Sequence, residues 1–584
     1  MLDVGSAADD HPTDHLETEW QFDVSDLGPV RAWLLGLPEN EGFTLGGPDT
    51  RALVDSYLDT PDWRVFRCGY ALRIRTVGER SEATLKELRR QQDPAEGLEK
   101  GPAVRREITQ PVPEPKSPSS PSDPTFRCAS AALFSAPGPV TDRLQCILHP
   151  EELQILAVIR TIRETFPLFR EGRVEGEVTL DRSSLTADAA HSGVQPCLLR
   201  VEIESSAEEL GPLSAFVGLL RAVAGMAEAA ESKFEWALKA RGLTPVWMQD
   251  LGRTEPDSSM TVGEVAYAVL RKHFASFLMH EPGTRLGEDP EHLHDMRVAT
   301  RKMRAALRLF QEALPLQETT RLRGELWTVG GSLGKVRDLD VQIAHMESCK
   351  AALIMVGPEA AAPLLRLLEA RREQARAELL SFLDSPRFVL LREALSQLLG
   401  RCPSAGRPAA QLPIRVAGPI LIRREHRKLV RLARGIERSS APATYHLARI
   451  LGKRLRYALE FLEPVYGPPA RELIDALIVF QDLLGLHQDD QVSMALLREL
   501  SEEGTLPDPA RLAIGEMAQM SAAHAEKLRG DFSRAWRGLG GKRWNRWKSA
   551  ARESTGEFAV ETIRHAKECL RRPQEAPKGP ETVT

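Results

Sequence analysis

One helical pattern occurs twice in this chain, and it constrains the fold more than any other feature. The first copy begins at His294 and places basic residues along one stripe of a helix, because they recur at helical steps. The second copy begins at His446, about 150 residues later, which is too long a period for a solenoid. Each basic residue follows its histidine at the same spacing in both copies. The duplication predicts a pseudo-twofold helical domain.

A second pair of matching segments follows the two stripes. Arg337-Asp-Leu-Asp340 comes after the first stripe, and Gln488-Asp-Asp-Gln491 comes after the second. If the copies face each other, their stripes would line one shared groove for a polyanion. One departure is Glu460, which takes the place that Arg308 has in the first copy.

The alternative interpretation of each stripe is an ordinary solvated helix face. Such a face usually mixes charges, whereas residues 415–456 contain twelve Lys or Arg and only two acids. We therefore favour a polyanion site. Residues 420–436 add further arginines on one helix face. The candidate binding residues are His294, Arg297, Arg301, Arg304, Arg337, Arg423, Arg427, His446, Arg449, Lys453 and Arg456.

These stripes and the segments that follow them resemble the CHAD domain over residues 261–570. The resemblance implies an all-helical pair of helix bundles whose basic surface binds inorganic polyphosphate. Neither histidine has a nucleophile or a carboxylate partner at fixed spacing, so we interpret the helical half as a binding module.

Residues 15–242 show a different pattern, in which apolar and charged residues alternate as in antiparallel strands with one polar face. The charged positions are almost all Arg, Lys, Glu or Asp, which suits an inner wall. Basic side chains would bind phosphate oxygens, and carboxylates would hold a hard divalent cation. We predict helices at 151–158 and 207–242, and a Pro- and Ser-rich insertion at 111–124.

This half resembles the CYTH family of triphosphate tunnel metalloenzymes. The resemblance implies an eight-stranded antiparallel tunnel that binds a triphosphate with Mg²⁺ or Mn²⁺. Family activities include hydrolysis of inorganic or organic triphosphates and adenylate cyclisation. The matching segments are Glu17-x-Glu19, Tyr57-x-Asp59-Thr60, Leu72-Arg-Ile-Arg75, Leu85-Lys86, Arg105-x-Glu107, Leu180-Asp181, Glu202-x-Glu204 and Ser232-Lys233-Phe.

The predicted fold class is α+β, with an N-terminal antiparallel β tunnel flanked by helices and a C-terminal all-α pair of bundles. The candidate metal ligands are Glu17, Glu19, Asp181, Glu202 and Glu204, and the first two are also the candidate catalytic residues. Oxygen ligands suit Mg²⁺ or Mn²⁺ better than zinc. The candidate substrate-binding residues are Arg73, Arg75, Lys86, Arg105, Arg160 and Lys233.

Gln21 is a departure that bears on activity. The family opens with Glu-x-Glu-x-Lys, and here glutamine replaces the lysine, which leaves a hydrogen-bond donor but no cation. Three functions stay open: a metal-dependent triphosphatase coupled to polyphosphate binding, a non-catalytic polyphosphate-binding or targeting protein with a degenerate tunnel, and a nucleic-acid binder. The third is the least favoured, because few aromatic residues interleave with the basic ones.

Composition sets the remaining expectations. The net charge is only −5, but local charge steers a ligand more than net charge does. Seven cysteines without a Cys-x-x-Cys pair disfavour a disulfide framework or a thiolate zinc site. No signal peptide or membrane-spanning run is evident, so we expect a cytoplasmic protein, with polyphosphate granules as a further place of association. We expect disorder at 1–14 and 571–584 and a linker at 243–260.

Overall fold

The computed structural model describes most of the 584-residue chain, which forms two compact units, Met1–Trp247 and Met248–Thr584. The expected disordered tails and the 111–124 insertion lie almost entirely outside the described residues, as do residues 246–249 of the expected linker. The described residues are 13–36, 42–88, 102–113, 133–148, 153–186, 196–206, 210–222, 226–245, 250–401, 407–504 and 506–571.

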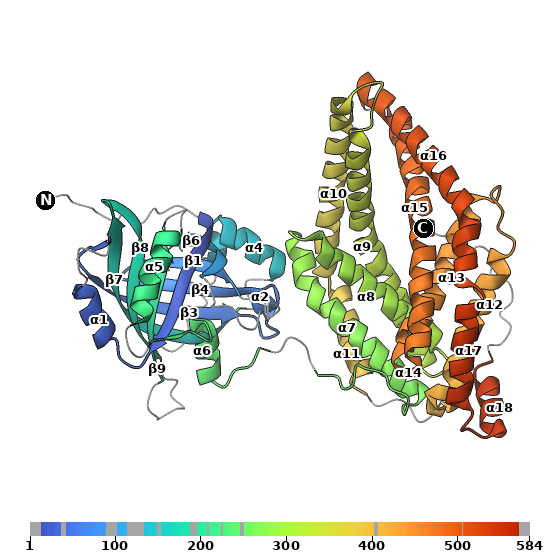
Figure 1. The fold of residues 1–584 in the computed structure, drawn as a ribbon, viewed down its shortest axis with the longest axis horizontal. Helices are drawn as coiled ribbons and strands as arrows, with labels where there is room; N and C mark the ends of the chain where they lie inside the picture. Colours follow the sequence, from blue (N-terminus) through green and yellow to red (C-terminus); the bar gives the residue numbers. More distant parts are fainter. Residues whose placement is uncertain are drawn as a thin grey trace. The chain divides into compact units, whose positions relative to one another are not determined.

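The first unit is an antiparallel sheet that closes on itself (Figure 1). Its strands follow the order β1-β6-β5-β4-β3-β7-β8-β9, and β9 pairs back to β1, which gives an eight-stranded barrel without free edges. The short strands β2 and β10 add to β7 and β1. The strands are β1 Thr13–Val24, β2 Thr44–Leu45, β3 Asp49–Asp59, β4 Tyr70–Val77, β5 Arg80–Glu87, β6 Ala103–Val112, β7 Gln154–Arg170, β8 Arg173–Leu185, β9 Cys197–Ser205 and β10 Met226–Glu228.

The apolar core of this unit lies outside the barrel wall. On β1, Trp20 and Phe22 point outward and pack in one cluster with Leu34 and Phe216 from the covering helices, so the alternate residues of the strand point inward. The helices are α1 Gly28–Leu35, α2 Arg64–Arg67, α4 Pro139–Ile147, α5 Gly211–Arg221 and α6 Lys233–Ala240. The barrel therefore has a polar interior and an apolar coat, which confirms the predicted tunnel.

Three local predictions are wrong in whole or in part. Most of 151–158 forms the beginning of β7, because Ala157 and Ile159 pair with β3 and extend a sheet. Residues 207–242 do not form one helix; their described part contains α5, β10 and α6. The predicted insertion also starts too early, since β6 continues through Pro111 and Val112.

The second unit is helical and contains the duplication as two similar series (Figure 1). The two stripes lie on α8 and α13, both 20 residues long, and each precedes a long helix, α9 of 35 residues or α15 of 36. The helices are α7 Val262–Leu286, α8 Pro290–Leu309, α9 Leu316–Lys350, η3 Pro358–Ala361, α10 Ala362–Leu383, α11 Pro386–Leu399, η4 Pro408–Gln411, α12 Ile414–Ala433, α13 Pro442–Phe461, α14 Glu463–Tyr466, α15 Pro468–Glu503, α16 Asp508–Leu539, α17 Lys542–Thr555 and α18 Val560–Cys569.

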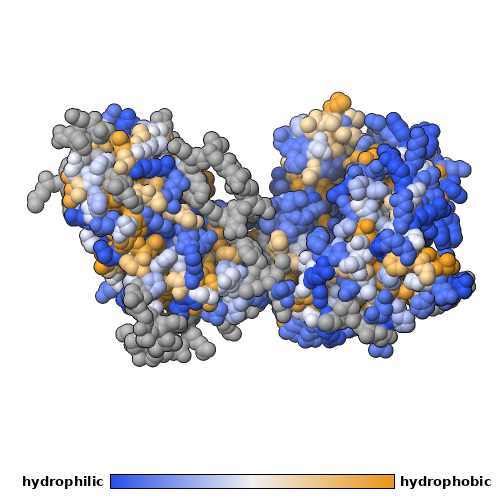
Figure 2. All heavy atoms as spheres, turned by 60° about the horizontal axis from the view of Figure 1, so that its bottom comes forward, coloured by the Kyte–Doolittle hydropathy of each residue, from blue (hydrophilic) through white to orange (hydrophobic). Residues whose placement is uncertain are grey.

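The same local geometry recurs in both copies. A Cβ atom added to Gly334 would lie 3.6 Å from Nε of Arg297, and one added to Gly485 would lie 4.0 Å from Nε of Arg449. In each copy, therefore, the first arginine of the stripe lies over a glycine of the long helix. Hydrophilic side chains cover much of the face of this unit that Figure 2 shows. Within the described residues, no helix combines the length and apolar character needed to cross a bilayer.

Candidate active site and polyanion surface

The barrel interior encloses a cavity of about 370 Å³, a size typical of small-ligand sites. Its wall is strongly charged, because every second residue of each strand points inward. The cavity is lined by nine of the sequence-predicted residues: Glu17, Glu19, Arg73, Arg75, Lys86, Arg105, Glu202, Glu204 and Lys233.

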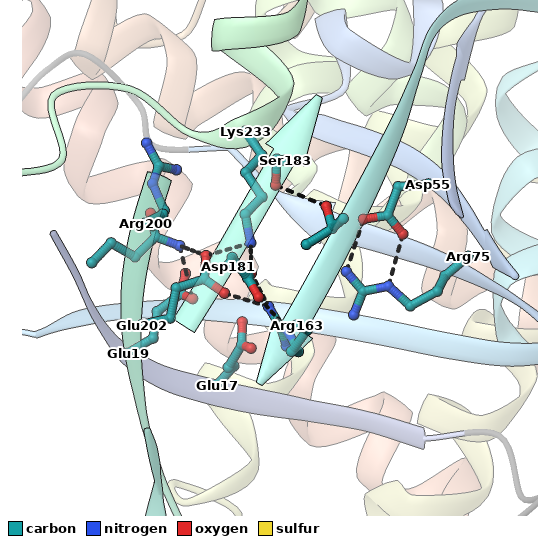
Figure 3. Close-up of polar contacts among 12 residues, drawn as sticks. Glu17, Glu19, Asp55, Arg75, Arg163, Asp181, Ser183, Arg200, Glu202 and Lys233 are labelled. Atoms are coloured by element: carbon teal, nitrogen blue, oxygen red, sulfur yellow. Dashed lines mark hydrogen bonds and ion pairs between the residues drawn. The ribbon is translucent and has the colours of Figure 1, made fainter. Parts of the chain in front are cut away.

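One part of the interior is a compact ion network around Asp181 (Figure 3). Arg163 donates to both oxygens of Asp181, at 2.9 and 2.7 Å, and to Glu202 at 2.6 Å. Lys233 contacts Asp181 and lies 3.0 Å from Glu202. The capping box between Ser232 and Glu235 begins α6 and places Lys233 at its first turn.

This network changes the interpretation of two predicted metal ligands. Asp181 is fully buried and does not line the cavity, and its oxygens already contact Arg163 and Lys233. Burial alone would raise the pKa of Glu202, but Lys233 and Arg163 hold it well below its usual value. In this structure Asp181 and Glu202 therefore compensate buried cations.

A second cluster of charges gathers around Lys86. Its ammonium group contacts Glu17 and lies 3.2 Å from Glu19 and 3.5 Å from Glu107. Burial raises the pKa of Glu17 to about 8, with Lys86 opposing the shift and Glu19 and Glu107 adding to it. Burial and neighbouring carboxylates likewise raise the pKa of Glu204 to about 7. Near neutral pH these pKa values keep Glu17 largely protonated and Glu204 partly protonated, and an added cation would favour their ionised forms.

Gln21 connects the two charge clusters. Its side-chain nitrogen donates to Glu19 at 2.9 Å and to Glu202 at 3.3 Å. The pairing of Gln21 with Glu202 across β1 and β9 creates this bridge. The amide therefore takes the place where the family motif would put an ammonium group, and it bridges the two acids without neutralising either.

The structure also corrects one substrate-binding prediction. Arg160 is exposed on the outer face of β7, whereas Arg163 points into the cavity. Residues an odd number of positions apart on a strand point to opposite faces, and the register of this long strand was not evident from the sequence. Of these two arginines, Arg163 is thus the site residue. Glu107, which was not among the predicted site residues, also lines the cavity and accepts from Arg73 at 3.3 Å.

Arg75 has a different environment from the other cavity cations. It donates two hydrogen bonds, of 2.7 and 2.9 Å, to Asp55, which is buried on β3 (Figure 3). Although burial alone would raise the pKa of Asp55, Arg75 lowers it strongly. Asp55 could have been found from the alternation of inward- and outward-pointing residues along β3. The prediction instead relied on the Tyr57-x-Asp59 motif, which lies further along the same strand.

In the helical unit, the two stripes meet where α8 contacts α13. We define the α8–α13 basic cluster as Arg297 and Arg301 of α8 with Arg449, Lys453 and Arg456 of α13. Burial lowers the pKa of Lys453 to about 6, and Arg301, Arg449, Arg297 and Arg456 lower it further. Cations from both copies therefore share one site, as the duplication predicted.

This cluster has few compensating acids. Within the described part of the chain, no ion pair involves Arg301, Arg449 or Lys453, and the Nε atoms of both arginines are buried without a hydrogen-bond partner. Arg297 contacts Asp338 at 3.2 Å. Burial raises the pKa of Asp489, which lies close enough to Arg449 and Lys453 for them to oppose that shift. An excess of buried positive charge favours an anionic ligand.

The remaining stripe residues surround the cluster. Burial, and then Arg337, lowers the pKa of His294, whereas His446 lies 2.7 Å from the side-chain oxygen of Gln488. Burial also lowers the pKa of Arg304, and the nearby charge of Arg323 adds to that shift. Glu460, the departure from the repeat, lies 3.0 Å from Lys302 and so joins α13 to α8.

Arg423 and Arg427 do not belong to this cluster. They lie on α12, and the charged group with the largest effect on Arg423 is Arg552 of α17. Helices α12 and α17 pack together. The structure therefore places two of the predicted polyanion-binding residues on another face of the unit.

Comparison with known proteins agrees with this architecture. Residues 36–217 match the CYTH domain and residues 268–498 match the CHAD domain. The chain therefore belongs to the proteins in which a CYTH domain is followed by a CHAD domain, and its barrel belongs to the triphosphate-tunnel family.

Two curated relatives are uncharacterized proteins of Mycobacterium tuberculosis, from strains CDC 1551 / Oshkosh and ATCC 25618 / H37Rv. Each is 24% identical over 557 residues, which cover 90% of this chain and 97% of the relative. Similar solved structures include PptA from Streptomyces chartreusis, with 21% identity, TM-score 0.41 and coverage of 47% of this chain and 99% of that one. The CHAD domain from Ricinus communis has 27% identity, TM-score 0.41 and coverage of 49% and 96%.

Enzymes of the CYTH family generally depend on divalent metal ions, so we asked whether the residues of this cavity could bind such an ion. The charge around Lys86 fits a cation, because burial and mutual repulsion raise the pKa values of Glu17 and Glu204. Asp181 does not fit, since cations already hold it. Among the described residues, no three His, Cys, Asp or Glu side chains are arranged to hold a metal ion.

We predict that Asp181 is needed for stability. Asp181→Asn would leave Arg163 and Lys233 with too little buried negative charge, so the free energy of unfolding should fall by about 3 kcal/mol. Chemical denaturation measures this loss. The control is Asp49→Asn, which removes an exposed ion pair with Arg51 and should cost less than about 0.5 kcal/mol. Equal effects of the two substitutions would contradict the prediction.

Proposed function

We propose that the barrel hydrolyses an inorganic or organic triphosphate with the help of Mg²⁺ or Mn²⁺, and that the helical unit binds inorganic polyphosphate. The observation that carries the first part is the cavity inside the barrel, whose wall combines phosphate-binding cations with an acid-rich cluster around Lys86. The observation that carries the second is the α8–α13 basic cluster, in which Arg297 and Arg456 pair with acids but Arg301, Arg449 and Lys453 have no ion pair among the described residues.

In the tunnel, the chain's own residues would bind and orient the phosphate groups. Five basic residues line the cavity and would contact the phosphate oxygens of the substrate: Arg73, Lys86, Arg105, Arg163 and Lys233. The phosphate oxygens would take the place of some of the carboxylate groups that these residues now contact. A divalent cation would bind among Glu17, Glu19 and Glu204, whose carboxylates would have to move closer together to share it. When bound, it would supply charge neutralisation and polarisation of the phosphoryl group. Water adds to the terminal phosphorus and the phosphoanhydride bond breaks, so that orthophosphate leaves. The cationic wall stabilises the charge that develops on the transferring group.

A specific observation also favours a second candidate function. Gln21 bridges Glu19 and Glu202 where the family motif has a lysine, so the chain adds no cation at that position. A tunnel in this state would bind a triphosphate without turnover. The protein would then be a polyphosphate-binding or targeting protein with a degenerate tunnel.

Phosphate release separates these two functions. We expect the protein to release orthophosphate from tripolyphosphate only when Mg²⁺ or Mn²⁺ is present. Arg105→Ala should lower the rate roughly 100-fold, because it removes a cation at the cavity wall. Arg160→Ala is the matched control and should leave the rate unchanged, because Arg160 lies on the outer face.

The same assay tests Gln21. Gln21→Lys should raise the rate, since it restores a cation between Glu19 and Glu202. Absence of turnover in the parent protein, together with its appearance in Gln21→Lys, would favour the degenerate-tunnel function. A lower rate in Gln21→Lys would contradict our explanation of the bridge.

We predict that the basic cluster is required for polyphosphate binding. Replacement of Arg297, Arg301, Arg449 and Lys453 together by Ala should abolish binding, because it removes most of the shared positive charge. Helicity by circular dichroism should stay the same, since these side chains have few protein partners. Binding can be measured by titration calorimetry with polyphosphate, and unchanged affinity would exclude this cluster as the site.

Polyphosphate affinity should also depend on pH through Lys453. In the free protein its pKa is about 6, and a bound phosphate chain would raise that pKa. Below about pH 6 the amine is already charged, whereas at higher pH binding must take up a proton, so affinity should fall as the pH rises above about 6. Lys453→Arg should flatten this dependence, because arginine stays charged. Lys302→Arg, whose lysine pairs with Glu460, is the control and should retain the dependence.

A further inference from the structure

A second basic face lies between α12 and α17. We define the α12–α17 basic face as Arg423 and Arg427 of α12, Arg434 at the C-cap of α12, and Lys548 and Arg552 of α17. The two helices pack together. Burial lowers the pKa of Arg423, and Arg552 and Arg427 lower it further. Burial likewise lowers the pKa of His426 to about 4, and Lys548, Arg427 and Arg434 add to that shift. Like charges from both helices are therefore close together.

Among the described residues, these cations lack acidic partners. Within the described residues, no ion pair involves any member of the face, and Nε of Arg423 is buried without a hydrogen-bond partner. The start of α12 differs, because Arg415 contacts Glu557 at 2.8 Å. In the part of the chain that the structure describes, a carboxylate thus neutralises the arginine at the start of α12, whereas no carboxylate pairs with the cations of the basic face that follows. A buried donor without a partner costs free energy unless a ligand supplies one.

In the first copy of the duplication, the residue equivalent to Arg423 is Arg271, and its side chain donates hydrogen bonds within the protein. Thr261 and Pro413, the N-caps of α7 and α12, pair with each other, and Arg271 and Arg423 follow their caps at the same spacing. Arg271 donates to the backbone oxygen of Leu399 at 2.9 and 2.7 Å. Among the described residues of the second copy, Nε of Arg423 has no such partner. The two copies have diverged where α12 gained its basic face.

The aromatic residues beside this face indicate the class of ligand. Trp544 stacks on His426, with ring centroids 3.5 Å apart, and also on Trp547 at 4.7 Å. Because Trp544 already stacks on both neighbours, it is less available to a nucleobase, and base stacking is what single-strand binders rely on. The ligand expected here is a chain of phosphates without bases.

We propose that the α12–α17 basic face is a second binding site for inorganic polyphosphate, separate from the α8–α13 basic cluster. This inference rests on the proposed polyphosphate-binding function for the identity of the ligand. Helix α12 packs against α13, which carries half of the cluster. A long chain would engage both sites, and a short chain would engage one. The helical unit would therefore prefer long chains through increased effective concentration.

The experiment uses the full chain and fluorescently labelled polyphosphate of two lengths. Arg427→Ala, Arg434→Ala and Lys548→Ala are combined, and Arg423 is kept so that the packing of α12 is undisturbed. Affinity for long chains should fall on the order of tenfold, while affinity for short chains should change little. The matched control removes three cations that already have acidic partners, by Lys335→Ala, Arg371→Ala and Arg438→Ala, and should bind like the parent.

The same substitutions in a variant that lacks the α8–α13 basic cluster distinguish this inference from the proposed function. In the protein without the α8–α13 basic cluster, weak binding of long chains should persist and should disappear when the α12–α17 substitutions are added. Unchanged long-chain affinity in both backgrounds would overturn the second site and leave the cluster intact. Loss of all binding on α12–α17 substitution alone would support this face and reject the cluster. Equal competition by single-stranded DNA at the remaining site would overturn the choice of ligand.

Discussion

A buried charge needs an opposite charge or a ligand, and this requirement governs both units of the protein. Inside the barrel, Asp181 is compensated by Arg163 and Lys233, so this part of the wall is stable without a ligand. Around Lys86 the raised pKa values of Glu17 and Glu204 show that an added cation would be favoured, whereas the α8–α13 basic cluster has an excess of positive charge. The places where compensation is incomplete are the places where we expect ligands to bind.

The barrel can hold so many charged side chains because much of its apolar core lies outside the wall, under the helices, and not inside the barrel. Trp20 and Phe22 pack outward under α1 and α5, which leaves the inward positions of β1 to Glu17, Glu19 and Gln21. Closure of the sheet removes free edges and holds these side chains at fixed spacing. A cavity built in this way can keep acids and bases together that would separate on an open surface.

The helical unit shows what duplication contributes and where the copies diverge. Arg297 and Arg449 lie over equivalent glycines and contribute to one cluster, so two weakly basic helices produce a strongly basic site. Arg271 and Arg423 also occupy equivalent positions, but only Arg271 donates to the carbonyl group of Leu399. The shared cluster therefore combines equivalent residues of the two copies, whereas the second basic face lies where the two copies differ.

The sequence by itself determined the fold class, the duplication and most of the charged cavity residues, because alternation and helical spacing are local properties of the chain. It did not determine that Arg163 rather than Arg160 points inward, since one residue of register reverses a strand's faces. Nor did it show that Asp181 is held by cations or that Arg423 faces α17. Those partners are distant in sequence, and only the packing of strands and helices brings them together.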